Sequence, residues 1–285
     1  MKYNIYHRLE YRYESHVSLG PQIIYLQPKQ DLTCEIIEYQ LEILPKASKI
    51  SSHKDAEGNH QQIAIIDQPT DYLIVELRAS VELNKFNPFD FYYIPKECQI
   101  LPIVYDHEHQ LILQPYISIE ECLSDIQVFS NQLREKANRF TSKFLMEVNE
   151  YIFQNFEYEI REEGFARSPF ETIQHQRGSC RDFAVLFAVI CQAQGLATRF
   201  ASGYYVGHSP MENPDQSHNL HAWVEVYLPG GGWIGFDPTQ NEVVCGNHIT
   251  LATSYDLTLI PPLRGYYNGT SISKLKSFVN ISSII

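Results

Sequence analysis

The stretch at 178–191, GSCRDFAVLFAVIC, constrains the fold of this chain more than any other. A Gly-Ser turn signal comes before Cys180, and every residue from Ala184 to Cys191 is apolar. A helix that is apolar on every side must be buried on every side. The helix is predicted to end at Gly195, where a left-handed cap is expected. The fold therefore needs other elements packed all round this one helix.

Cys180 occupies the first turn of the predicted helix. A thiol at that place meets unpaired backbone N–H groups and the positive end of the helix dipole. Both favour thiolate over thiol, which is how a cysteine becomes a nucleophile. The alternative is that Cys180 is a small buried hydrophobe beside a turn. A partner base elsewhere in the chain would decide between these two interpretations.

The segment from His221 to Asp237 offers such a base. Two alternating runs, 221–228 and 232–237, flank Pro-Gly-Gly-Gly and predict a β-hairpin. With the turn centred on residue 229, the residue numbers of two opposed residues add up to about 458, so that His221 faces Asp237 directly. A one-residue bulge in the turn would shift this register. A carboxylate beside the imidazole fixes its tautomer and stabilises the imidazolium, as the activation of a thiol requires.

Residues 1–110 are predicted to form an antiparallel β-sandwich domain. Polar and apolar side chains alternate at the N-terminus, and later runs are rich in β-branched and aromatic residues. Turn signals such as Asp55 to Asn59 separate these runs. The segment 84–117, which has four prolines, is expected to be a connection. The predicted strands lie at 3–13, 35–44, 61–67 and 72–82.

Residues 111–285 are predicted to form a second, α+β domain. A helix is expected to begin at Ser118-Ile119-Glu120-Glu121, which has capping-box spacing, and apolar residues recur at helical intervals up to Ile152. Helices packed on an antiparallel sheet, with the thiol at their junction, make an α+β architecture. Strands are predicted at 198–206, 221–228, 232–237, 248–252 and 272–284.

The amino-acid composition narrows the range of partners that this protein is expected to bind. The chain has 22 Lys+Arg against 34 Asp+Glu, and a net charge of -12 argues against nucleic acid or an anionic membrane as the main partner. The N-terminus lacks the apolar core of a signal peptide, and no apolar run is long enough to span a membrane, so a cytoplasmic protein is expected. The 6 cysteines show no regular spacing, which favours reduced thiols.

No metal or cofactor is expected. The stretch Asp106 to His109, and His218 with His221, lack the spacing of a zinc site. The sequence also lacks a calcium-binding EF-hand loop and a glycine-rich phosphate loop. Asp182, in the first turn of the apolar helix, is predicted to be a helix-start acid that pairs with Arg181 or Arg199.

Five motifs, of which the first contains Cys180, occur in a fixed order and resemble the transglutaminase-like superfamily. They are GSCRDFA at 178–184, GLATR at 195–199, SGY at 202–204, HAWVEVY at 221–227 and GWIGFDPT at 232–239. The likeness extends to a bacterial subfamily with an N-terminal β domain, through Tyr11-Arg12-Tyr13 and residues 55–59. The chain departs from that subfamily at 253–256, where relatives show Gly-Arg-Asp-Tyr.

The resemblance implies a papain-like core with Cys180 as nucleophile, His221 as general base and acid, and Asp237 as the residue that orients His221. Papain-type proteases supply a glutamine shortly before the cysteine as an oxyanion donor, which makes Gln174 a candidate beside the Cys180 backbone N–H. Trp223, next to the base, would shield the site from water.

Two classes of function remain open on the sequence. The first is a cysteine-dependent enzyme that attacks amide bonds of a peptide or protein and forms a thioester, with water or an amine as acceptor; a peptidase or amidase is favoured over a transglutaminase. An amidase on glycosylated asparagine would use the same core. The second is a binding module that keeps the fold and has lost the chemistry, and the intact Cys, His and Asp argue against it.

Overall fold

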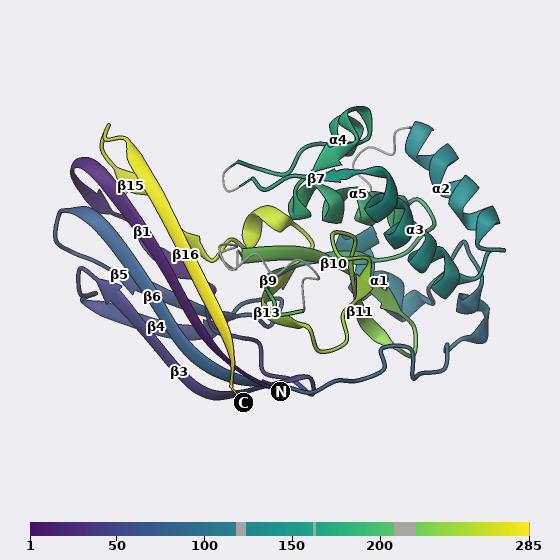
Figure 1. Cartoon of the computed structure of the whole chain (residues 1–285), viewed down its shortest axis with the longest axis horizontal. Coiled ribbons are helices and arrows are strands. Elements are labelled where there is room, and N and C mark those ends of the chain that lie inside the picture. The colour runs from purple at the N-terminus through teal and green to yellow at the C-terminus, as the bar shows by residue number, and fades with distance from the viewer. Residues whose placement is uncertain (118–123, 162–163, 208–219, 285) are drawn as a thin grey trace.

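The computed structural model describes residues 1–117, 124–161, 164–207 and 220–284. Strands dominate the N-terminal part, and the helices pack on a second group of strands, which confirms the α+β prediction (Figure 1). The expected helix start at Ser118 to Glu121 lies outside the described residues. Within the described part of the chain, none of the helices is long and apolar enough to cross a membrane.

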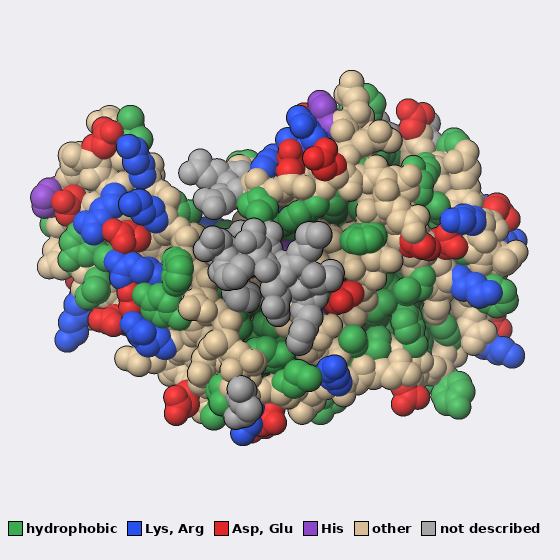
Figure 2. Space-filling view, in the orientation of Figure 1, with side chains coloured by type: hydrophobic (Ala, Val, Ile, Leu, Met, Phe, Trp, Pro, Cys, Tyr) green, Lys and Arg blue, Asp and Glu red, His purple; other side chains and the backbone are tan. Residues whose placement is uncertain are grey.

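The N-terminal part is built round one long strand, β1 (Lys2–Leu19). Alternate side chains of β1, such as Ile5 and Leu9, are buried in the core. Those between them, such as Arg8 and Glu10, form ion pairs on the outer face, where charges of both signs are intermingled (Figure 2). The sheet also contains β3 (Cys34–Leu44), β6 (Thr70–Leu83), β15 (Tyr267–Asn268) and β16 (Ser273–Ile284).

A second antiparallel sheet completes the N-terminal part. Its strands, in the order β14-β2-β5-β4, are β14 (Leu263–Arg264), β2 (Gln22–Ile24), β5 (His60–Ile65) and β4 (Lys49–Lys54). Apolar residues of both sheets, Ile24 and Leu77 among them, belong to one core cluster. The two sheets therefore enclose a core between them.

The end of the chain returns to the N-terminal part. Strand β16 pairs with β1 along its length, from Lys2 opposite Ile284 to Tyr13 opposite Ser273. The sequence-based division after residue 110 assigned this last segment to the second domain, as a strand at 272–284. The strand is present, but its hydrogen bonds tie it to the first domain.

The second part surrounds the apolar helix, α5 (Cys180–Gln192). Gly195 follows it with φ +80°, the left-handed cap that the sequence predicts. One face of α5 packs on α2 (Ser124–Lys136), α3 (Thr141–Asn155) and α4 (Pro169–His175). The other packs on a sheet of β12 (Glu242–Val243), β11 (Gly232–Asp237), β10 (Leu220–Leu228), β9 (Thr198–Tyr205) and β13 (His248–Ser254).

The segment 84–117 is not only a connection. It contains α1 (His107–Ile117), with Pro115 inside the helix. The side chain of Asp106 accepts a hydrogen bond from the backbone N–H of His109 at 2.9 Å, which is an N-cap. The acidic and histidine-rich stretch 106–109 thus caps and begins α1, which is a structural role. The proline near the end of the helix hid it from sequence-based prediction. Shorter elements are η1 (Lys96–Gln99), β7 (Glu157–Tyr158), β8 (Arg177–Gly178) and η2 (Leu257–Leu259).

The β10–β11 hairpin forms with a register different from the predicted one. Glu225 pairs with Gly235 and Leu228 with Gly232, so that Pro229, Gly230 and Gly231 make the turn. The turn is centred one residue later than expected, because Gly230 and Gly232 both adopt positive φ, at +92° and +75°. Each residue of β10 therefore pairs with a residue of β11 that lies two positions later in the sequence than predicted. A shift of two leaves every side chain on the same face of the sheet.

Candidate active site

Cys180 is the first residue of α5 and is 9% exposed. Ser179 is the N-cap, and its side chain and backbone N–H both donate to the Asp182 carboxylate, at 2.9 Å and 2.7 Å. Gly178 permits this tight entry, since a Cβ there would lie 2.8 Å from that of Asp182. The capping box fixes the cysteine where the helix begins, as the sequence predicts.

Asp182 has a partner that the sequence does not reveal. Its buried carboxylate accepts a hydrogen bond from Arg161 at 2.8 Å, whereas Arg199 pairs with Glu225 at 2.7 Å. The expected pairing with Arg181 or Arg199 is therefore wrong. Arg161 lies in a segment without secondary structure, which the chain brings back over the start of α5.

His221 and Asp237 come together despite the altered register. Nε2 of His221 lies 2.7 Å from Oδ2 of Asp237, and both side chains are buried. The other carboxylate oxygen accepts from the backbone N–H and the hydroxyl of Thr239, at 3.0 Å and 2.6 Å. Because Nε2 is held by the carboxylate, Nδ1 is the ring nitrogen left for Cys180, whose thiol interacts with His221.

His248, at the start of β13, is a further partner of Asp237. Its Nε2 lies 2.9 Å from the same Oδ2 that His221 contacts. Its Nδ1 is buried without a hydrogen-bond partner among the described residues. A lone histidine at the start of a predicted strand carries no sequence signal of this role. Asp237 is thus held by three side chains, those of His221, Thr239 and His248.

The electrostatics of the site favour charge separation between Cys180 and His221. Burial raises the pKa of the Cys180 thiol, but the hydrogen bond and positive charge of His221, with the Ala222 backbone N–H and Arg181, outweigh it and lower the pKa. Burial likewise lowers the pKa of His221, yet the charge of Asp237 and its hydrogen bond raise it well above the ordinary value. The pKa of Asp237 is held far below its usual range, since the two histidines outweigh its burial. These directions favour a thiolate–imidazolium pair backed by a carboxylate.

Tyr158, on the two-residue strand β7, brings a hydroxyl to the thiol. Burial, followed by the charge of Cys180, raises the pKa of this phenol, and Tyr158 lines the same cavity as Cys180. Strand β7 pairs in parallel with β8, which places Tyr158 beside Gly178. A strand so short has no sequence pattern, so that sequence reasoning missed this residue.

The two remaining candidates, Gln174 and Trp223, are not among the residues that line the cavity around the thiol. Gln174 is exposed on α4 and is not among the residues that line the cavity. Trp223 is fully buried, and its ring contacts that of His248 edge-on, with centroids 4.9 Å apart. It packs beneath the histidines and is not part of the cavity surface.

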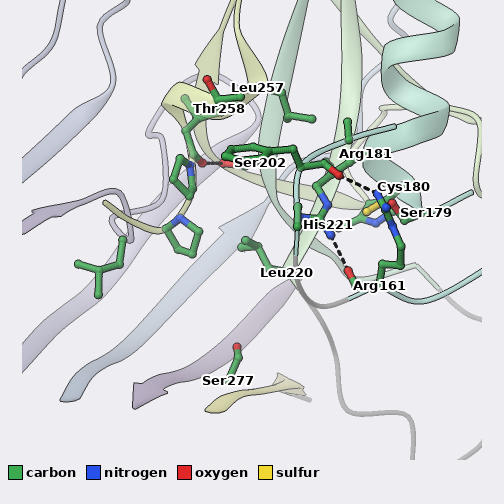
Figure 3. A pocket seen from close by; sticks show the side chains of 18 of the residues that line it. Arg161, Ser179, Cys180, Arg181, Ser202, Leu220, His221, Leu257, Thr258 and Ser277 are labelled. Atoms are coloured by element: carbon green, nitrogen blue, oxygen red, sulfur yellow. Dashed lines mark hydrogen bonds between the residues drawn. The ribbon is translucent and has the colours of Figure 1, made fainter. Parts of the chain in front are cut away.

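Cys180 and His221 lie side by side in a cavity of about 540 Å³ (Figure 3). Tyr158 and Arg181 also line it. The volume is in the range of small-molecule and cofactor sites. The catalytic candidates are therefore accessible from a defined pocket.

One buried group, His221, Asp237 and His248, has its possible ligand atoms within 4.8 Å of one another. Both imidazole Nε2 atoms already face the same oxygen of Asp237. Hydrogen bonds thus account for the group without a metal ion. Of the histidines considered at 218 and 221, the first lies outside the described residues.

The comparisons with known proteins agree with this geometry. Residues 128–238 match the transglutaminase-like superfamily, and residues 3–82 match the bacterial transglutaminase-like N-terminal region. Residues 128–238 thus form a transglutaminase-like domain, and the catalytic candidates 180, 221 and 237 all lie within it.

The similar proteins include one whose activity is named. An uncharacterized protein of Mycobacterium tuberculosis is 25% identical over 285 residues, which cover 93% of this chain and 87% of the relative. A protein-glutamine gamma-glutamyltransferase of Pseudomonas aeruginosa is 37% identical over 65 residues, 22% of this chain and 10% of that enzyme.

A solved structure shares the whole fold. The crystal structure described as "a Putative Cysteine Protease from Cytophaga hutchinsonii" has a TM-score of 0.72 and 20% identity, and covers 100% of this chain and 91% of that one. At this identity the likeness concerns the fold alone. The N-terminal sheets and the helical core thus occur together in that protein too.

Proposed function

We propose that this protein is a cysteine-dependent enzyme that cleaves amide bonds through a thioester on Cys180. The observation that carries the proposal is the chain of contacts from Asp237 through His221 to a thiol of lowered pKa in an accessible cavity. The same three residue types, arranged in this way, activate nucleophiles on unrelated folds.

The steps follow from the positions of these groups. The Cys180 thiolate attacks the carbonyl carbon of an amide, and the tetrahedral intermediate collapses as the C–N bond breaks. The His221 imidazolium gives its Nδ1 proton to the leaving nitrogen. Water then loses a proton to His221 and attacks the thioester, which releases a carboxylic acid and restores the thiolate–imidazolium pair. Asp237 holds the ring in one orientation throughout.

The negative oxygen of the tetrahedral intermediate needs donors beside the sulfur. In our proposal the Cys180 backbone N–H at the start of α5 is one donor, and the Tyr158 hydroxyl is the other. Tyr158 takes the place that the sequence suggested for Gln174, because Tyr158 lines the cavity with Cys180 and feels its charge, whereas Gln174 is not among the lining residues.

The acceptor in the second half of the reaction separates a hydrolase from a transferase. An amine in place of water would give the transfer reaction of a transglutaminase, with the same acyl-enzyme. We favour water, since the described catalytic residues open into one cavity and no separate amine site adjoins them among the residues described.

Peptide digestion with and without a primary amine tests the proposal. Products are read by mass spectrometry from the wild type, Cys180→Ala and the control Cys245→Ala, which changes a half-buried thiol outside the cavity. We expect amide cleavage in the wild type and the control and none in Cys180→Ala. Failure of the wild type to form a thioester even with p-nitrophenyl acetate would favour a binding module instead.

A further inference from the structure

The cavity that contains Cys180 is closed on its far side by the N-terminal sheet. Leu9 and Tyr11 of β1 line it together with Leu275 and Ser277 of β16. Leu9 stands opposite Ser277, and Tyr11 opposite Leu275, so that the four side chains form one patch on a single face of the sheet. Figure 3 shows Ser277 across the cavity from the strand that carries His221.

The segment after β13 adds a second apolar wall. It is anchored by the Ser202 hydroxyl, which donates to the Ile260 carbonyl at 2.9 Å (Figure 3). The apolar residues of this segment that line the cavity are Leu257, Ile260, Pro261, Pro262 and Leu263. Together with the sheet patch, they make the part of the cavity away from the thiol largely hydrocarbon.

Charge is confined to the side of the cavity near Cys180. Among the described lining residues there is no carboxylate and no lysine, and the arginines are Arg161 and Arg181. Arg161 is paired with the buried Asp182, and the Arg181 guanidinium donates to the carbonyls of Gly164 and Arg161 at 2.5 Å and 2.6 Å.

The far wall has one titratable imidazole, that of His7. It is buried beside β16, and Nδ1 lies 2.8 Å from the Tyr204 hydroxyl. Burial lowers its pKa to about 4, so that the ring is uncharged at neutral pH. The wall therefore offers neither a cation nor an anion to a substrate.

We propose that this wall, formed by the β1–β16 patch and the 257–263 segment, binds an apolar side chain or acyl chain next to the carbonyl that Cys180 attacks. The inference rests on the proposed function and names its substrate class: amides whose acyl portion is apolar. A charged chain would lose its hydration there without gaining a partner, and is disfavoured. The N-terminal domain thereby contributes to specificity while it supplies no catalytic group.

Active esters of different acyl chains test the proposal on the full-length protein. Release of nitrophenol from p-nitrophenyl acetate and p-nitrophenyl hexanoate measures thioester formation, corrected by the rate of Cys180→Ala. Each buried methylene contributes about 0.8 kcal/mol, or roughly fourfold in rate. With four additional methylenes, we expect hexanoate to acylate Cys180 at least tenfold faster than acetate. The glutarate monoester, which ends in a carboxylate, should be slower than hexanoate.

Two substitutions in strand β16 test which surface causes the preference for hexanoate over acetate. Leu275→Asp places a charge on the wall at a partly exposed position, and Phe278→Asp makes the same kind of change on the opposite face of β16, outside the cavity. We expect Leu275→Asp to reduce the hexanoate-to-acetate ratio at least fivefold and Phe278→Asp to leave it unchanged. The rate with iodoacetamide, which needs no apolar wall, should be the same in all three proteins.

The outcomes separate the two proposals. Equal rates for acetate and hexanoate, a glutarate ester faster than hexanoate, or an unchanged ratio in Leu275→Asp would each overturn the apolar wall while leaving the enzyme intact. Absence of acylation by both esters, together with slow alkylation of Cys180, would instead overturn the proposed function.

Discussion

His221 and Asp237 meet diagonally across the β10–β11 hairpin. Nε2 of His221 and Oδ2 of Asp237 are 2.7 Å apart. The hairpin pairs Val224 with Phe236, which places Asp237 across from Trp223, two residues along the strand from His221. Diagonal neighbours on one face of an antiparallel pair lie within reach of long side chains. The contact therefore survives a register that differs by two from the one expected of the sequence.

Replacement of Asp237 by asparagine should slow acylation by about 10²- to 10⁴-fold, because the imidazole loses the partner that fixes its tautomer. The fold should persist, since asparagine can still accept from Thr239. Single-turnover nitrophenol release from p-nitrophenyl acetate measures the effect, and circular dichroism checks the fold. An Asp237→Asn protein that acylates at the wild-type rate would leave a Cys-His dyad as the mechanism.

His248 should act through Asp237 as a positioning residue. His248→Leu removes one donor to the carboxylate and should slow acylation roughly tenfold while lowering the free energy of unfolding by about 1–3 kcal/mol. His248→Gln, which keeps a donor, should recover part of the rate. A profile of rate against pH distinguishes positioning from structure: loss of His248 should move the alkaline limb, which reports His221. Equal profiles in all three proteins would make His248 purely structural.

Whether the sequence can predict the role of a site residue depends on which element holds that residue in the fold. Cys180, His221 and Asp237 belong to motifs with strong local patterns, a helix start and a hairpin, and their placement on one site could be predicted. The turn register could not, because any of three consecutive glycines can adopt the positive φ that centres the turn.

Other features depend on tertiary pairing that no local pattern encodes. His248, Tyr158 and Arg161 reach the site from an edge strand, a two-residue strand and a loop. The return of β16 to β1 is a pairing between the two ends of the chain. Contacts at such sequence separation are visible only in the fold.

Tyr158→Phe should separate acylation from alkylation. Loss of an oxyanion donor should lower the acylation rate by about 10²- to 10³-fold. Alkylation by iodoacetamide forms no oxyanion, so its rate should change little at a pH where the thiolate is fully formed. Both rates are measured on the same preparation. A parallel loss of both would mean that Tyr158 serves the thiolate and not the intermediate.

Asp182→Asn should destabilise the start of α5. The change leaves Arg161 without its buried counter-charge, which costs about 3–5 kcal/mol for a broken buried pair; since Arg161 is 25% exposed, the lower part of that range is expected. Urea denaturation measures the free energy of unfolding. Lys2→Met, which breaks an exposed pair with Glu82, is the control and should have little effect. Similar stabilities of Asp182→Asn and the control would contradict the structural role of Asp182.

The measurement that most directly tests the central claim is the alkylation rate of each cysteine against pH, followed by mass spectrometry. The lowered pKa of Cys180 predicts a rate that rises with a midpoint well below the ordinary thiol value of about 8.5. The pKa values of Cys34, Cys98, Cys191 and Cys245 are all raised by burial, so these thiols serve as internal controls. In wild-type protein at pH 6, about 2.5 units below the ordinary thiol pKa, Cys180 alone among these five cysteines should react rapidly, and His221→Ala should abolish this selectivity. A Cys180 midpoint at or above about 8.5, or reactivity equal to that of Cys245, would contradict the thiolate–imidazolium pair.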